Sequence, residues 1–120
     1  MDNPGALIDR YIATWNETDA GRRRELIAQT YAEAATYLDP VMQGEGRDGI
    51  DAMIEGVQAR FPDHRFRRIG DVDSHHDCIR FRWELAAEGG AIVVSGTDFG
   101  VVAEGARFQA VTGFFDQVPA

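Results

Sequence analysis

The sequence predicts an α+β fold in which three helices pack on one face of a curved antiparallel sheet. In the first half of the chain, apolar residues recur at the spacing of amphipathic helices. In the second half, four long segments alternate between apolar and polar residues or run apolar, with short turns between them. The 120 residues contain no internal repeat, no low-complexity segment and no linker, so we expect a single domain over residues 1–120.

Two capping pairs mark the first two helices. Asn3 and Pro4 supply an N-cap and a first-turn proline. The apolar residues that follow lie on one helix face: Leu7, Ile8, Tyr11, Ile12 and Trp15. Thr18 and Asp19 predict the start of a second helix. Its buried residues would be Leu26, Ile27 and Tyr31.

A short strand is predicted over residues 35–39, where Pro40 ends it. Because side chains alternate along a strand, Tyr37 and Asp39 would share a face. Residues 43–49 are polar and rich in glycine, which predicts a loop. A third helix would begin at about Asp48 and end before Pro62.

The second half of the chain predicts four antiparallel strands at residues 66–72, 78–87, 91–102 and 107–118. Polar or glycine-rich segments at 73–77, 88–90 and 104–106 predict the hairpin connections between them. In the second of these strands the apolar and charged residues take opposite faces: Ile79, Phe81, Trp83 and Leu85 against Arg80, Arg82 and Glu84.

Composition and charge exclude several classes of function. The net charge is −8 and all twelve basic residues are arginine, so Schiff-base and P-loop lysines are excluded. Nucleic acid and anionic membranes require a basic surface, so neither is expected as a partner of this acidic chain. The single cysteine, Cys78, cannot form an internal disulfide. Since no signal peptide is evident either, we expect a cytoplasmic protein.

The predicted order of elements and four short motifs resemble the nuclear transport factor 2-like superfamily and, within it, the SnoaL-like and ketosteroid-isomerase-like families. The motifs are RYIATWN at residues 10–16, YLDP at 37–40, GTD at 96–98 and VTGFFD at 111–116. The resemblance covers nearly the whole chain and implies a cone-shaped sheet packed against helices, a cystatin-like α+β roll. The apolar cavity at the mouth of such a cone suits a small hydrophobic molecule.

The resemblance to ketosteroid isomerase implies three catalytic residues. Tyr11 and a protonated Asp98 would form an oxyanion hole, and Asp39 would be the base. Moving a proton alpha to a carbonyl needs such donors for the charge that develops on oxygen. The apolar neighbours of Asp98 favour its neutral form, whereas the polar loop beside Asp39 favours the anion. A polyketide-cyclase-like activity is implied equally by the SnoaL-like resemblance.

The expected substrate-binding residues are the aromatic side chains Trp15, Tyr37 and Phe99. Trp15 and Phe99 are close in sequence to Tyr11 and Asp98. No cofactor is expected. Two functions remain open: a cofactor-free isomerase or cyclase, and a non-catalytic module that binds a ligand or forms a dimer.

The histidines do not predict a metal site. His75 and His76 are adjacent, so on an extended chain they would point to opposite faces and could not easily share an ion. His64 could be a general base by residue type alone.

Four arginines are expected on one face of neighbouring strands: Arg65, Arg67, Arg80 and Arg82. Proteins of the superfamily often pair through their sheets, and arginine suits such interfaces. The sequence therefore predicts a homodimer through this sheet face, the alternative being a solvated face.

Overall fold

The computed structural model describes residues 3–118 as three helices and a six-stranded sheet. The helices are α1 (Pro4–Asn16), α2 (Ala20–Thr30) and α3 (Gly46–Arg60). The strands are β1 (Tyr31–Leu38), β2 (Gln43–Glu45), β3 (His64–His75), β4 (Cys78–Ala87), β5 (Ile92–Ala103) and β6 (Arg107–Gln117). The predicted α+β class, with helices on one face of a curved sheet, is confirmed.

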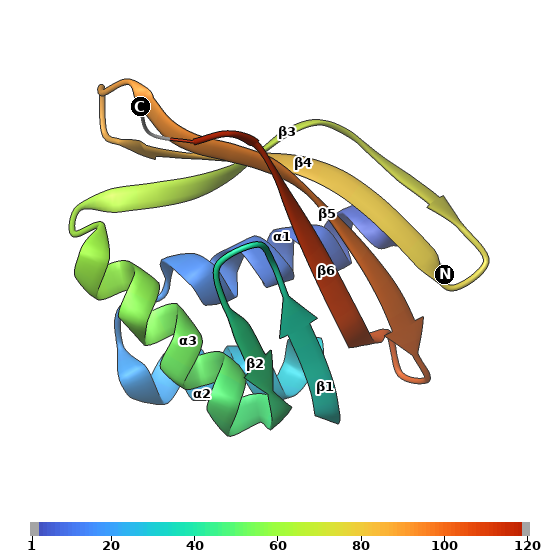
Figure 1. Cartoon of the computed structure of the whole chain (residues 1–120). Coiled ribbons are helices and arrows are strands. Elements are labelled where there is room, and N and C mark those ends of the chain that lie inside the picture. The colour runs from blue at the N-terminus through green and yellow to red at the C-terminus, as the bar shows by residue number, and fades with distance from the viewer. Residues whose placement is uncertain (1–2, 119–120) are drawn as a thin grey trace.

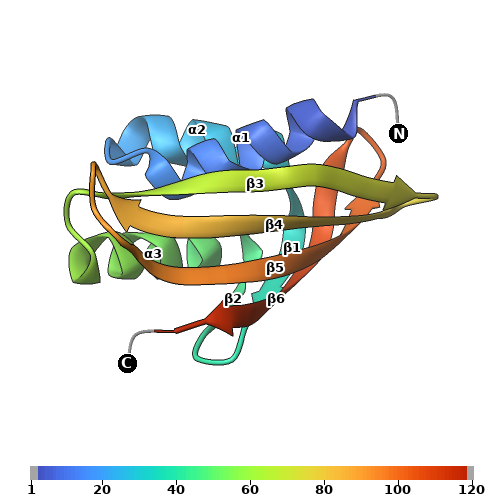
Figure 2. The ribbon, with the colours of Figure 1, turned by 90° about the horizontal axis from the view of Figure 1, so that it is seen from above.

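The strands follow the order β2-β1-β6-β5-β4-β3 across the sheet. Figure 1 shows the sheet arching over the helices, and Figure 2 shows β3, β4 and β5 running side by side. Strands β3 to β6 form the predicted antiparallel meander. Strand β1 pairs in parallel with β6, so the whole sheet is mixed rather than antiparallel. This pairing joins distant segments and leaves no turn signal in the sequence.

The helix caps form as predicted. The Asn3 side chain accepts a hydrogen bond from the backbone N–H of Ala6 at 3.0 Å, and Asp19 accepts one from Arg22 at 2.9 Å. Each bond satisfies an N–H group that the first turn of a helix leaves unpaired. No helix among the described residues is long and apolar enough to cross a membrane.

Several predicted boundaries were wrong, among them those of the first strand, which spans Tyr31–Leu38 rather than residues 35–39. Residues 43–45 form β2, an edge strand held by backbone pairing with β1, and α3 begins at Gly46 directly after it. Tyr31 is the first residue of β1 rather than part of the second helix, because the backbone turns extended there. Strand β3 continues to His75, so the predicted hairpin connection is reduced to His76 and Asp77.

Candidate functional site

A cavity of about 260 Å³ is lined by α1, α3 and the inner face of the sheet. Most of its walls are apolar, including Trp15, Phe61, Phe66, Trp83, Leu85 and Phe115. Its hydroxyl and carboxyl groups belong to Tyr11, Tyr37, Asp39 and Asp98. Apolar walls with a few convergent polar groups are typical of small-molecule sites.

Asp98 has a hydrogen-bond donor on each carboxyl oxygen. The Tyr11 hydroxyl donates to Oδ2 at 2.7 Å, and the Trp83 indole Nε1 donates to Oδ1 at 2.9 Å. Asp98 is 3% exposed and Tyr11 1%. Helix α1 and strands β4 and β5 thus bring a hydroxyl, an indole and a carboxyl group together.

A glycine allows Trp83 to reach Asp98. In the β4–β5 register Trp83 is opposite Gly96, and the next inward pair is Phe81 and Asp98. A Cβ atom on Gly96 would lie 2.6 Å from Cζ2 of the Trp83 ring, closer than real Cβ contacts. The bare backbone at Gly96 therefore lets the indole lie across β5.

Asp39 is held by three donors at the end of β1. Its Oδ2 accepts from the Tyr37 hydroxyl at 2.8 Å, and its Oδ1 accepts from the backbone N–H groups of Val41 at 2.9 Å and Met42 at 3.0 Å. The bond to Val41 is the local turn that an aspartate before a loop favours. Asp39 is 7% exposed, so these bonds replace most of its contact with water.

Gly113 on β6 lies between the two aspartates. A Cβ atom there would lie 2.8 Å from Asp98 Oδ1, 3.2 Å from the Tyr37 hydroxyl and 3.3 Å from Asp39 Cβ. The β5–β6 register places Gly113 opposite Asp98. The absence of a side chain at Gly113 therefore lets Asp98 and the Tyr37–Asp39 pair approach β6 from either side.

The pKa of Asp98 is raised from 3.8 to about 6, mainly by burial. The hydrogen bonds from Tyr11 and Trp83 favour the carboxylate and lower this pKa, whereas the negative charge of Asp39 raises it. Burial also raises the pKa of Tyr11 and Tyr37 well above their ordinary value, so both hydroxyls remain protonated. The site therefore holds stable hydroxyl donors and one carboxyl group that titrates close to neutral pH.

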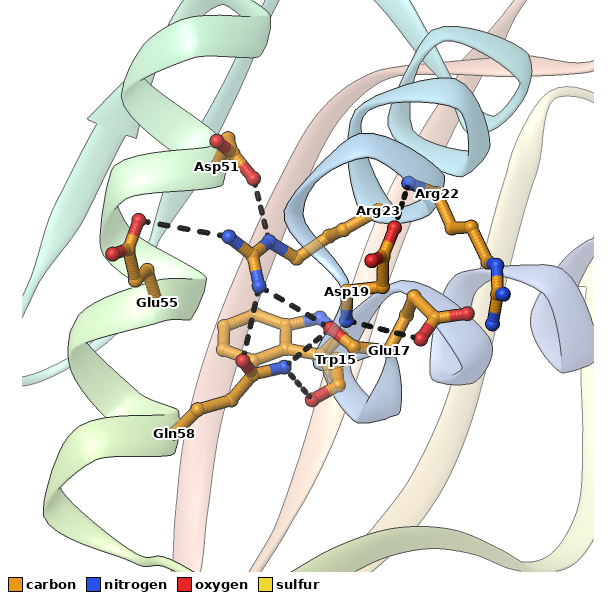
Figure 3. A network of polar contacts seen from close by, with 8 residues as sticks. All are labelled: Trp15, Glu17, Asp19, Arg22, Arg23, Asp51, Glu55 and Gln58. Carbon is orange, nitrogen blue, oxygen red and sulfur yellow. Dashed lines mark hydrogen bonds and ion pairs between the residues drawn. The ribbon is translucent and has the colours of Figure 1, made fainter.

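A buried arginine fixes the end of α1 against α3 (Figure 3). Arg23 is 2% exposed; its Nε donates to Asp51 at 2.6 Å and its Nη1 to the Gln58 side chain at 3.0 Å. The Gln58 amide in turn donates to the backbone oxygens of Trp15 at 3.1 Å and Glu17 at 2.9 Å. This network holds the two helices that line the cavity in a fixed relation.

Five of the six site residues expected from the sequence line the cavity: Tyr11, Trp15, Tyr37, Asp39 and Asp98. Their roles in catalysis and substrate binding stay predictions. Phe99 does not line it, which corrects the expectation. Because side chains alternate along β5, Phe99 lies on the opposite face from Asp98 and is 39% exposed.

Sequence reasoning missed the contact of Trp83 with Asp98, because it assigned Trp83 only to the core. The predicted turn at residues 88–90 could have indicated this contact. A hairpin centred there brings residue 83 close to residues 96–98 on the neighbouring strand. Arg60, which also lines the cavity, gave no signal in the sequence.

The histidines lie outside the cavity. His75 and His76 are exposed at the β3–β4 turn, and the ring Nδ1 of His64 is 2.8 Å from the Pro62 carbonyl oxygen. Within residues 3–118, no group of three or more His, Cys, Asp or Glu side chains is arranged to hold a metal ion.

The sequence matches the family model of the SnoaL-like domain over residues 8–110. No curated protein matches it. A solved structure from Agrobacterium tumefaciens str. C58, of a SnoaL-like family protein proposed to be an isomerase, is 42% identical with a TM-score of 0.91. That match covers 97% of this chain and 99% of the other.

Two more distant solved structures share the fold. A proposed polyketide cyclase from Sinorhizobium meliloti is 14% identical with a TM-score of 0.70, over 90% of this chain and 93% of the other. A nuclear transport factor 2-like protein of unknown function from Exiguobacterium sp. 255-15 is 20% identical with a TM-score of 0.72, over 92% of this chain and 98% of the other. The predicted resemblance to this superfamily and to SnoaL-like proteins is confirmed.

Proposed function

This chain belongs to the family of SnoaL-like domains, and from that premise we propose that it binds a small hydrophobic carbonyl compound and moves a proton alpha to the carbonyl. The observation that carries the proposal is the buried pair of Tyr11 and Asp98, 2.7 Å apart in a cavity with apolar walls. A relative 42% identical to this chain, proposed to be an isomerase, supports the same class of reaction.

In this proposal the carbonyl oxygen of the ligand lies beside Tyr11 and Asp98. An apolar ligand displaces water from the cavity and so raises the pKa of Asp98 beyond about 6, because burial is already the main cause of its shift. The Tyr11 hydroxyl then turns from Asp98 Oδ2 to the carbonyl oxygen, and neutral Asp98 donates its own proton in a second hydrogen bond to the same oxygen. Donors fixed in a dry site stabilise the negative charge that develops there.

Asp39 is the proposed base. Its carboxylate takes the proton from the α-carbon, the electron pair of the C–H bond forms a carbon–carbon double bond, and the π pair of the carbonyl moves onto oxygen to give an enolate. Return of the proton from Asp39 to another carbon of the conjugated system completes an isomerisation. In a cyclase, the enolate carbon attacks a second carbonyl of the same molecule, and the new alkoxide takes the proton from Asp39.

Exchange of the α-proton for deuterium tests this function directly. We would follow a panel of β,γ-unsaturated ketones and polyketide-like ketones in D2O by NMR, with wild type, Asp39→Asn and Asp116→Asn. Asp116 is an exposed carboxylate bonded to Thr97 and does not line the cavity. We expect exchange by wild type and Asp116→Asn and at least about a 100-fold loss in Asp39→Asn. Absence of exchange by wild type on every ketone would favour a binding module.

One observation favours that second candidate, a non-catalytic ligand-binding module. Three donors already occupy the two carboxyl oxygens of Asp39 and hold the group in one orientation. A network satisfied in this way can orient a ligand without transferring a proton. The two candidates share the cavity and differ in the exchange experiment.

A homodimer through the outer face of the sheet is the proposed assembly. Leu38, Phe99 and Phe114 are 51%, 39% and 58% exposed. Thr112 is opposite both Leu38 and Phe99, and Thr97 is opposite Phe114, so the three apolar side chains share one face. This patch supports the proposal, because exposed apolar patches are typical of interaction surfaces. We also propose that the protein is cytoplasmic.

A further inference from the structure

Arg60 is the only basic residue among the described residues that line the cavity. It is the last residue of α3 and is exposed, whereas Asp98 and Tyr11 are 3% and 1% exposed. A lining residue open to solvent marks the mouth of a cavity, and buried lining residues mark its inner end. The guanidinium thus lies on the solvent side of the cavity, and Asp98 and Tyr11 lie on its buried side.

The guanidinium of Arg60 is held without a carboxylate. Its carbon Cζ lies 5.9 Å from the centre of the Phe61 ring, a cation–π contact, and Phe61 also lines the cavity. Two other exposed arginines are paired, Arg67 with Glu84 and Arg80 with Asp73, but the others without an ion pair in the described part of the chain do not line the cavity. In the described part of the chain, Arg60 has no such ion pair. The planar N–H donors of its guanidinium group remain available for a ligand.

We infer that the ligand of this cavity carries a carboxylate, which Arg60 binds at the mouth while the carbonyl lies at Asp98 and Tyr11. This inference rests on the proposed function and narrows its substrate class to hydrophobic keto acids. Two parallel N–H donors of a guanidinium match the two oxygens of a carboxylate. Arg60 is a single cation, so it can pair with one carboxylate group of a ligand.

A pair of fluorescent probes of matched shape tests the inference. 6-Hydroxy-2-naphthoate carries a hydroxyl for the inner end and a carboxylate for the mouth, and its methyl ester has the same frame without the charge. Binding of both would be measured by fluorescence titration at pH 7 with wild type, Arg60→Gln, Arg60→Lys and Arg24→Gln. Arg24 is an exposed arginine on α2 that does not line the cavity.

We expect wild type and Arg24→Gln to bind the acid about tenfold more tightly than the ester, as for one partly exposed charged hydrogen-bond pair. Arg60→Gln should abolish this preference and leave the affinity for the ester unchanged. Arg60→Lys keeps the positive charge but loses the two parallel N–H donors, so it should retain part of the preference for the acid. Added salt should reduce the preference of wild type.

A preference for the ester in wild type, or an equal loss for both probes in Arg60→Gln, would overturn the inference. If the ester binds and the acid is not preferred, the inference fails while the proposed cavity function stands. If wild type binds neither probe, the proposed function fails together with the inference.

Discussion

The indole Nε1 of Trp83 donates a hydrogen bond to Asp98 Oδ1 at 2.9 Å, which leaves this buried carboxyl group with a donor on each oxygen. Burial and the nearby Asp39 favour the neutral acid, and the two donors favour the anion. The pKa of about 6 is the balance of these opposing effects. Asp98 can therefore change its charge when the surroundings of the cavity change.

Trp83→Phe removes one of the two donors while keeping a ring in the cavity wall. Because that hydrogen bond lowers the pKa of Asp98, we expect the titration midpoint of Asp98 to rise by about one pH unit in the variant. Carboxyl 13C NMR measures the midpoint. The matched control is Trp15→Phe, since Trp15 also lines the cavity but its Nε1 has no hydrogen-bond partner. An equal shift in both variants would contradict a specific role for Trp83.

Asp98→Asn tests the same balance through stability. The pKa of Asp98 is about 6 in the folded protein and 3.8, its ordinary value, in the unfolded chain, so the folded state binds the proton more tightly. The stabilisation from this proton is complete below pH 3.8 and is lost as pH rises through 6. Between pH 4.5 and 7.5 wild type should lose roughly 2 kcal/mol of unfolding free energy from this group.

Urea unfolding at the two pH values measures this loss. The difference between wild type and Asp98→Asn should change by that amount, and the difference between wild type and Asp116→Asn should not. A pH-independent difference for Asp98→Asn would show that Asp98 titrates normally in the folded protein.

Gly113→Ala places a methyl group between the two aspartates. The new Cβ would lie 2.8 Å from Asp98 Oδ1, so the strands or the carboxyl group must shift, at a cost of about 1–3 kcal/mol in unfolding free energy. Gly56→Ala is the control, because Gly56 is an exposed residue of α3 and a Cβ there meets nothing within 4 Å. This substitution should stabilise the helix by up to about 1 kcal/mol. Urea unfolding measures the change in unfolding free energy for each variant. Equal effects of the two substitutions would contradict the close approach at Gly113.

Phe114→Glu tests the proposed homodimer. A charge in the centre of an apolar interface would have to be desolvated on association, so the variant should sediment as a monomer where wild type is a dimer. Gln29→Glu, on the exposed surface of α2, adds the same charge away from the sheet and should leave the dimer intact. Monomeric wild type across the micromolar range would contradict the proposal.

Local signals in the sequence were sufficient for much of the fold. Asn3 and Asp19 cap helices where their side-chain chemistry predicted, and the alternation in β4 gave its bounds as Cys78–Ala87. Strand β2 and the parallel β1–β6 pairing could not be predicted, because backbone hydrogen bonds between polar or distant segments leave no side-chain pattern.

The candidate site was predictable to a similar extent. Tyr11, Asp39 and Asp98 were found through the family resemblance, and they meet in one cavity. Phe99 was expected there because it is next to Asp98 in the sequence. Adjacent side chains of a strand point to opposite faces, so Phe99 lies on the outer face instead. The contact of Trp83 with Asp98 depends on the missing side chain of Gly96, a tertiary effect that periodicity does not show.

The protonation state of Asp98 in a ligand complex is the sharpest test of its proposed part in the oxyanion hole. 2-Naphthol, a phenol that resembles an enol, would be titrated into the protein at pH 7 while the carboxyl 13C signal of Asp98, assigned with Asp98→Asn, is followed. We expect ligand binding to raise the pKa of Asp98 from about 6 to above the pH of the titration, so that the signal moves to the position of the neutral acid. A saturated complex in which Asp98 remains ionised at pH 7 would contradict this expectation.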